Sequence, residues 1–177
     1  MFDDFPYQKH CDQLGTLQLM LMSYHTGALI VHIFDTRKND FIEMLLHHSV
    51  TLYLYGFSYI FNLWETATVI AYLHDMSDIT VCLTRLFIET EYKKCALFWF
   101  LTNAAIWFYV RLYVFPQLVY DCWATPIELG HWCLKPIYVF LLSSLVVLHA
   151  YWFYMFLYIF YIQVFKKGLS KMSTENF

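Results

Sequence analysis

Charged residues are scarce in this sequence of 177 residues: Asp, Glu, Lys and Arg together make up 14% of it, whereas soluble domains usually carry about 25%. Hydrophobic residues make up 60%, and the mean hydropathy is +0.48. The net charge of −3 leaves no basic field for a phosphate backbone, which excludes a nucleic-acid-binding protein. These shortages favour a multi-pass helical membrane protein over a soluble, disordered or coiled-coil chain.

Glycine and proline are also few, with five and four residues, which disfavours collagen-like, low-complexity and many-turned β architectures. The sequence contains neither an internal repeat nor an N-x-Ser/Thr sequon, and its five cysteines form no CxxC pair. Cys122 and Cys133 fall in one predicted lumenal loop (120–136), where they either form a disulfide or remain free thiols. Cys82 is interpreted as a small apolar filler within a helix.

Five apolar stretches are long enough to cross a bilayer core, which needs about 20 residues per helix. The predicted spans are 14–34, 41–61, 64–87, 95–114 and 137–165. The expected fold is therefore all-α, a multi-pass transmembrane helical bundle. The segments flanking these spans are expected to be a lumenal N-terminal segment (1–13) and a cytosolic basic tail (166–177), on either side of a transmembrane domain (14–165).

Lysine and arginine gather on one predicted side of the membrane. That side holds the loop between spans one and two, the loop between spans three and four, and the tail, with Arg37, Lys38, Lys93, Lys94, Lys166, Lys167 and Lys171. Basic loops are usually cytosolic, so the N-terminus is expected in the lumen and the C-terminus in the cytosol. No basic stretch followed by a short apolar run precedes the first span, so we expect a chain that is short at its N-terminus.

Two groups of ionisable residues lie inside the predicted second and third spans: His47 and His48, then His74, Asp75 and Asp78. A charged residue at the centre of a membrane helix costs roughly 2.5–3.5 kcal/mol on insertion scales, so such residues usually face the bundle interior and have partners. A rise of about 1.5 Å per residue from each helix end places both groups in the cytosolic half of the bilayer. We expect them to meet in one intramembrane pocket.

Three roles fit such a pocket. A structural polar network would pin two helices together, and a single hard metal ion would take His and Asp ligands, although histidine-box spacings are absent. Acyl transfer would use an imidazole whose tautomer a carboxylate fixes; the imidazole would deprotonate an amine or hydroxyl nucleophile, or attack a thioester itself. The cytosolic depth favours acyl transfer between a soluble acyl-CoA and a lipid acceptor, without a metal or bound cofactor.

Other polar residues lie inside the predicted spans, and the sequence allows more than one role for most of them. Thr51 lies one turn beyond His47 and is expected to extend the polar stripe. His149 is predicted either to line the same pocket or to pack as a hydrogen-bonded core histidine. His25 and His32, seven residues apart on one face of the first span, have either a structural role or a role in an acyl channel.

The segment 40–51 (DFIEMLLHHSVT), together with 58–62 and 74–78 (HDMSD), resembles the Lag motif of ceramide synthases, which are members of the TLC-domain family. The spaced match is strong over about 40–85. Weaker similarities outside it are Arg37-Lys38, Arg111-Leu112 with Phe115-Pro116, and Leu148-His149 with Trp152.

This resemblance implies an enzyme of the endoplasmic-reticulum membrane that moves a fatty acyl group from acyl-CoA to the amine of a sphingoid base, forming ceramide. The family's functional histidine pair falls on His47 and His48, and its two aspartates fall on Asp75 and Asp78. Secondary candidates for the site are His74, His149 and Thr51. The implied partners are acyl-CoA as cosubstrate, a sphingoid base and membrane lipid, with a homo- or hetero-dimer left open.

Four positions depart from the family pattern: Glu65 replaces an arginine, Ala67 a glycine, Cys82 an acidic residue and, as a mild change, Arg85 a lysine. Glu65, Cys82 and the short N-terminus support a second hypothesis, a non-catalytic TLC-type protein that binds, senses or moves lipid. In that case the His–Asp cluster would hold a lipid head group or specify the fold. A third hypothesis is a proton-coupled transporter, which the lack of repeat symmetry disfavours.

Overall fold

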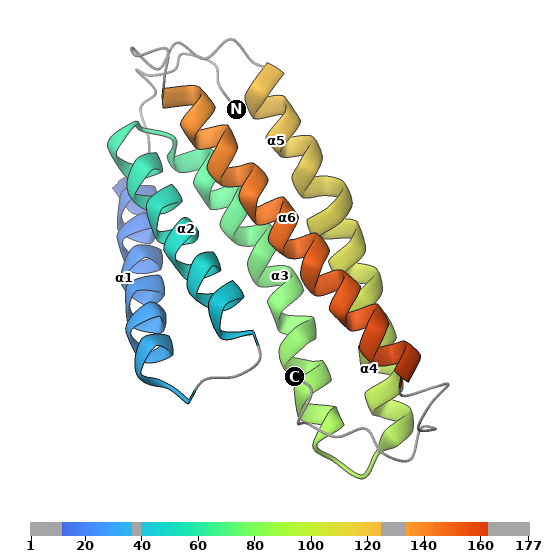
Figure 1. The fold of residues 1–177 in the computed structure, drawn as a ribbon. Helices are drawn as coiled ribbons and strands as arrows, with labels where there is room; N and C mark the ends of the chain where they lie inside the picture. The colour runs from blue at the N-terminus through green and yellow to red at the C-terminus, as the bar shows by residue number, and fades with distance from the viewer. Residues whose placement is uncertain (1–11, 37–39, 125–133, 163–177) are drawn as a thin grey trace. The chain divides into compact units, whose positions relative to one another are not determined.

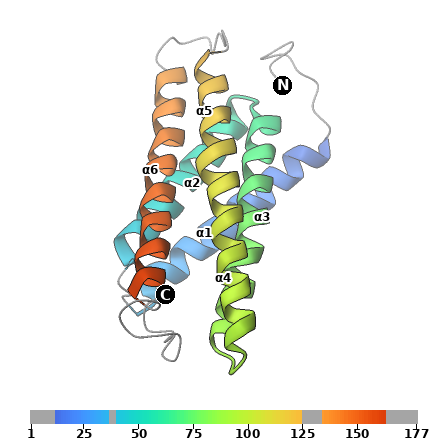
Figure 2. The ribbon, with the colours of Figure 1, turned by 90° about the vertical axis from the view of Figure 1, so that its right-hand side faces the viewer.

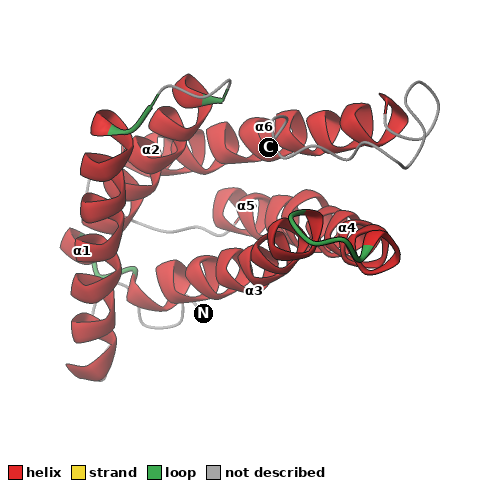
Figure 3. Cartoon of the chain, turned by 90° about the horizontal axis from the view of Figure 1, so that it is seen from below, coloured by secondary structure: helices red, strands yellow, loops and turns green. Residues whose placement is uncertain are grey.

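The computed structural model of the chain describes residues 12–36, 40–124 and 134–162, and all regular elements among them are helices (Figure 3). In order they are α1 (Asp12–Phe34), α2 (Phe41–Ile60), α3 (Trp64–Ile88), α4 (Lys93–Trp107), η1 (Phe108–Val114), α5 (Phe115–Ala124) and α6 (Leu134–Tyr161). The predicted all-α class is confirmed. The predicted end segments 1–13 and 166–177 lie almost wholly outside the described residues, so their boundaries stay predictions.

Three of the described helical stretches are long and apolar enough to cross a membrane: Asp12–Phe34, Lys93–Ala124 and Lys135–Tyr161. They correspond to the predicted first, fourth and fifth spans, which confirms the membrane-protein class. The predicted second and third spans are the helices α2 and α3, of 20 and 25 residues, and they do not reach the same apolarity. Both carry the ionisable residues of the predicted site, and their crossing of the membrane stays a prediction.

The predicted loop 120–136 is shorter in the structure, because α5 continues through Ala124 and α6 already begins at Leu134. Asp121 is exposed on the surface of α5, where a helix tolerates a charge. Pro136 falls in the first turn of α6, where the missing N–H has no intrahelical partner to lose. Asp121 and Pro136 therefore lie within helices, and they do not belong to the loop as predicted.

A proline inside the fourth helical stretch is accompanied by a π-helical segment. Pro116 lacks an N–H, and its ring crowds the carbonyl four residues earlier, which an ordinary α-helical turn does not accommodate. The segment η1 widens the turn just before it, and the N–H of Phe115 donates to the carbonyl of Val110. As a result α4, η1 and α5 form one continuous stretch (Figure 2), with Arg111 in its π-helical part.

The chain divides into two compact units, residues 1–71 with 117–148 and residues 72–116 with 149–177. In the first unit α1 lies alongside α2 (Figure 1). Their shared core consists of Tyr55 from α2 and Ala67 and Ala71 from α3, with Leu21 and Met22 of α1 packed against them. Burial of this apolar cluster orders the helices on which the first polar site lies.

The start of α3 is held against α1 by a close approach and a polar contact. Gly15 is buried against the Trp64 ring, and Gln18, fully buried, donates from Nε2 to the Trp64 carbonyl (3.3 Å) and to Oγ1 of Thr68 (3.1 Å). Small residues allow helices in membranes to approach closely, and amide side chains link them by hydrogen bonds. Gly15 is therefore a packing position.

We expect Gly15→Val to lower the unfolding temperature of the purified protein, because a Cβ at this position would lie 3.0 Å from two Trp64 ring carbons and overpacking typically costs about 1–3 kcal/mol. Gly27→Val is the matched control, since no described atom lies within 4 Å of a Cβ there. Thermal unfolding of both variants in the same detergent checks the expectation. Equal unfolding temperatures would contradict it.

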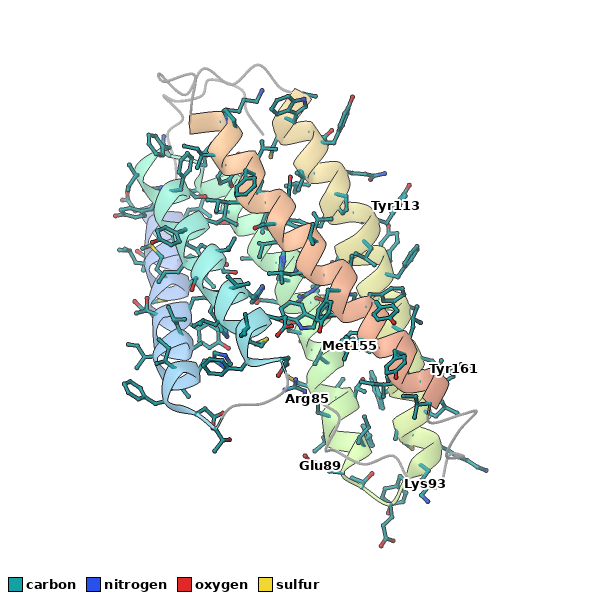
Figure 4. The ribbon with its side chains drawn as sticks, viewed as in Figure 1. Arg85, Glu89, Lys93, Tyr113, Met155 and Tyr161 are labelled. Carbon is teal, nitrogen blue, oxygen red and sulfur yellow. The ribbon has the colours of Figure 1, made fainter. Side chains whose placement is uncertain are left out.

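The second unit contains the remainder of α3, α4, η1 and the second half of α6. Oγ1 of Thr80 donates to Oδ1 of Asn103 (2.8 Å), and Oγ1 of Thr84 donates to the Trp99 carbonyl (3.0 Å), so α3 and α4 are joined by buried polar bonds. Figure 4 shows Lys93 at the start of α4 and Tyr161 at the end of α6 at the same end of this unit. The two helices therefore run antiparallel.

Candidate functional site

Four imidazole rings come together between α1 and α2 of the first unit, and we call them the histidine cluster: His25, His32, His47 and His48. His48 is central, because its ring centroid lies 6.3 Å from that of His25, 5.9 Å from that of His32 and 5.6 Å from that of His47. The predicted pair on α2 is thus joined by both histidines of α1. The expectation that His25 and His32 share one face of their helix is confirmed, because both rings lie near His48.

The two histidines of α1 are held in different ways. Nε2 of His32 lies 2.9 Å from the carbonyl oxygen of Phe41, and the Phe41 ring stacks on the imidazole at 4.7 Å. Because a carbonyl can only accept, Nε2 of His32 carries the proton of this hydrogen bond. His25 instead stacks on Tyr55, with 5.1 Å between ring centroids.

Several polar atoms of this region have no hydrogen-bond partner among the described residues: Nδ1 of His25, Nδ1 of His48 and Oγ1 of Thr51. A buried polar atom left unpaired costs about 1–3 kcal/mol, so such atoms in a native structure require an explanation. They have the capacity to bind a polar group of a ligand. The place of Thr51 in the predicted polar stripe stays a prediction.

A second polar cluster lies in the other unit and is centred on Arg111, which is only 3% exposed. Its Nε donates to Oγ of Ser77 (2.6 Å), and its Nη2 donates to the carbonyl of His74 (3.2 Å) and pairs with the carboxylate of Asp78. The guanidinium also lies over the Trp107 ring, 4.0 Å from its centroid. We call these residues the Arg111 cluster.

His74 and His149 lie beside this cluster, with 4.9 Å between their ring centroids. His149 is fully buried, and both rings pack against Phe115, at 5.1 and 5.5 Å. The indole Nε1 of Trp107 donates to the His149 carbonyl (3.1 Å). His149 is thus a core histidine beside His74, and its place in the predicted pocket stays a prediction.

The structure brings the predicted residues together in two groups, His47 with His48 and His74 with Asp78. Asp75 is exposed on α3, three residues before Asp78. The expectation that both groups share one pocket stays a prediction. Among the described parts of the chain, no three His, Cys, Asp or Glu side chains are grouped as ligands for one metal ion.

The predicted site did not include Arg111. This residue belongs only to a weak family similarity, although it is a formal charge inside a predicted span. Charged residues inside a membrane usually have partners. This rule holds for the fourth predicted span as for the third, and it indicates Arg111 as a candidate site residue. Its partner Asp78 was already a candidate.

At two of the positions that depart from the family pattern, Glu65 and Ala67, the local structure accommodates the residue that is present. Glu65 lies exposed in the first turn of α3, where a negative charge interacts favourably with the helix dipole. Ala67 is buried and packs in the core of the first unit. Cys82 is exposed on α3, and Cys122 is buried, whereas Cys133 lies outside the described residues. The two alternatives for Cys122 and Cys133, a disulfide or two free thiols, therefore both stay open.

Comparison with known proteins gives the family. The model of the TLC domain matches residues 1–158, so the chain belongs to the TLC domain family, as its Lag-like motif indicated. Ceramide synthase 4 of Bos taurus is 30% identical over 181 residues, which cover 99% of this chain and 45% of that protein.

Two other relatives carry related names. Ceramide synthase 5 of Homo sapiens is 27% identical over 157 residues, covering 86% of this chain and 39% of that protein. Ceramide synthase LOH2 of Arabidopsis thaliana is 30% identical over 141 residues, covering 75% of this chain and 47% of that protein. The chain spans about half the length of the curated relatives it matches.

Proposed function

We propose that this chain is a sphingoid-base N-acyltransferase of the ceramide-synthase type, which uses acyl-CoA to acylate sphinganine or sphingosine. The observation that carries the proposal is His48, an imidazole surrounded by three others and retaining a buried ring nitrogen that no described residue binds. An imidazole with a free nitrogen can take a proton or attack an acyl carbon. The names of the relatives supply the substrate class.

Two routes use the same imidazole. In the first, the amine nitrogen of the sphingoid base attacks the thioester carbonyl while the imidazole takes a proton from that amine. The C–N bond forms, the C–S bond breaks, and the imidazole passes the proton to the departing thiolate of CoA. In the second, the imidazole attacks the thioester, releases CoA and forms an acyl-imidazole that the amine then cleaves. Asp75 and Asp78 are proposed to orient and charge-balance the histidines. Acyl-CoA is consumed as cosubstrate, and neither route requires a bound cofactor.

The test is ceramide formation in membranes that contain the expressed chain, supplied with sphinganine and acyl-CoA of several chain lengths. We expect N-acylsphinganine from the unaltered chain and loss of product in the His47→Ala/His48→Ala double variant, because both candidate imidazoles are removed. Ser143→Ala, which alters an exposed side chain on α6, is the control and should keep activity. Product that persists in the double variant would refute this site.

A non-catalytic lipid-binding protein is the second candidate, and the unpaired polar atoms near His48 and Thr51 fit it equally, because they can bind a lipid head group without reaction. The two candidates differ in the fate of acyl-CoA. Sphinganine binding to the inserted, intact protein without release of free CoA would favour the second. CoA release coupled to amide formation would favour the first.

The proposed location is the endoplasmic-reticulum membrane, with the C-terminus in the cytosol. The membrane-spanning helices establish only that this is a membrane protein. The basic residues 37–38, 93–94, 166–167 and 171 favour the orientation by the positive-inside rule. A cytosolic end for these segments would give the site access to soluble acyl-CoA.

A further inference from the structure

We propose that His32 of α1 is a positioning residue for His48, an inference that rests on the proposed acyltransferase function. Both residues belong to the first unit, and their ring centroids lie 5.9 Å apart with the planes tilted by 52°. The Lag-like motif does not include His32, which precedes it on a separate helix. The proposed catalytic site therefore includes a residue of α1 in addition to those of α2.

His32 is anchored to the helix that carries His48. Its Nε2–H donates to the carbonyl of Phe41, the first residue of α2, and the ring stacks on Phe41 with 22° between the planes. One hydrogen bond and one stack together fix both the position and the rotation of the ring. An anchored ring of this kind orients a neighbouring group without first losing rotamer entropy.

The anchor also fixes the tautomer. Because Nε2 carries the proton, Nδ1 of a neutral His32 has a lone pair and can only accept a hydrogen bond. Ring nitrogens lie about 1.1 Å from the centroid, so the nitrogens of His32 and His48 are at least about 3.7 Å apart, too far for a direct hydrogen bond. One hydroxyl group spans such a gap by donating to Nδ1 of His32 and accepting from His48.

The bridging oxygen has two sources, a water molecule or a hydroxyl group of the sphingoid base. In both cases the bridge holds the His48 ring in one orientation, with its other nitrogen directed away from the bridge for proton transfer or acyl attack. Nδ1 of His48 has no partner among the described residues, which leaves it available for one of these tasks. His32 thus acts through His48.

The test compares His32→Leu, which removes the Nε2–H donor and the Nδ1 acceptor, with His32→Gln, whose amide can donate to the Phe41 carbonyl and accept through its own oxygen. We expect His32→Leu to lower kcat at least about 10-fold, as loss of a partner that orients a functional histidine typically does, with little change in KM for acyl-CoA. His32→Gln should recover most of kcat. Val31→Leu, at an adjacent exposed residue, is the matched control.

Thermal unfolding of the same variants separates positioning from structural support. If kcat follows the unfolding temperature across the three variants, or if His32→Leu keeps full kcat, the inference is wrong while the acyltransferase proposal stands. No product from the unaltered chain, shown to be inserted and folded, would overturn both. Repeating the assay with a long-chain primary amine that carries no hydroxyl group distinguishes the two bridges: an effect of His32→Leu that disappears with this substrate identifies a substrate hydroxyl, and an effect that persists identifies water.

Discussion

His48→Ala is expected to abolish ceramide formation, by at least about 10²- to 10⁴-fold, without lowering the unfolding temperature of the protein. The catalytic loss follows because His48 is the imidazole that the other three rings of the histidine cluster surround. The stability is retained because the substitution also removes a buried Nδ1 that has no hydrogen-bond partner among the described residues, and such an atom is itself destabilising.

The measurement pairs the rate of N-acylsphinganine formation with thermal unfolding in the same detergent. His47→Ala is the matched variant, since it removes the neighbouring imidazole of the same helix, and we expect it to retain more activity than His48→Ala. A large fall in unfolding temperature for His48→Ala would indicate that the ring is a structural support. Retained activity would show that His48 does not carry the chemistry.

This combination of lost activity and kept stability is typical of functional sites, where polar groups are left unpaired for a ligand at some cost to the fold. The same reasoning separates the two proposed functions from a purely structural network. A network that existed to pin helices would have its ring nitrogens bonded to each other, because a half-satisfied buried network destabilises. The unpaired atoms near His48 and Thr51 argue against that alternative.

The sequence predicted the fold class and the residues of the α2 pair, because apolar runs and polar exceptions within them are local signals. It also predicted that His25 and His32 share a face, since a spacing of seven is two helical turns. It could not predict that this face meets His48, because the packing partner of α1 depends on contacts between helices. The resemblance, strong over about 40–85 and weak outside, likewise included no residue of α1.

Arg111 shows a different limit. Its charge was visible, but the π-helical turn before Pro116 changes which side of the helix a residue occupies, so α-helical periodicity does not place it reliably. The pair with Asp78 joins residues 33 positions apart, and no local pattern indicates such a contact. The predicted loop 120–136 was too long for a related reason: proline in a first turn and an exposed aspartate are compatible with helix.

Loss of the Asp78 carboxylate is expected to destabilise the protein strongly. Asp78→Ala leaves the guanidinium of Arg111, which is 3% exposed, without its counter-charge. Breaking a buried pair costs about 3–5 kcal/mol, and removing both partners together often costs much less. Since Asp78 itself is 58% exposed, we expect a loss of about 2–4 kcal/mol.

A double-variant cycle in thermal or denaturant unfolding tests this expectation. Asp78→Ala/Arg111→Met should be more stable than Asp78→Ala alone, because the second substitution removes the uncompensated buried charge and a methionine can still pack on Trp107. Asp75→Ala is the matched control, as it removes an exposed carboxylate one turn earlier on α3 and should cost much less.

If the double variant is instead less stable than Asp78→Ala by the full cost of Arg111→Met, the guanidinium is held mainly by Ser77, the His74 carbonyl and Trp107. In that case the Asp78 carboxylate is energetically independent of Arg111. A strong coupling would mean that any loss of activity in Asp78 variants must be judged against folding. Only an Asp78→Asn variant that keeps the hydrogen bond and the fold, yet loses turnover, would then support a direct role of Asp78 in the reaction.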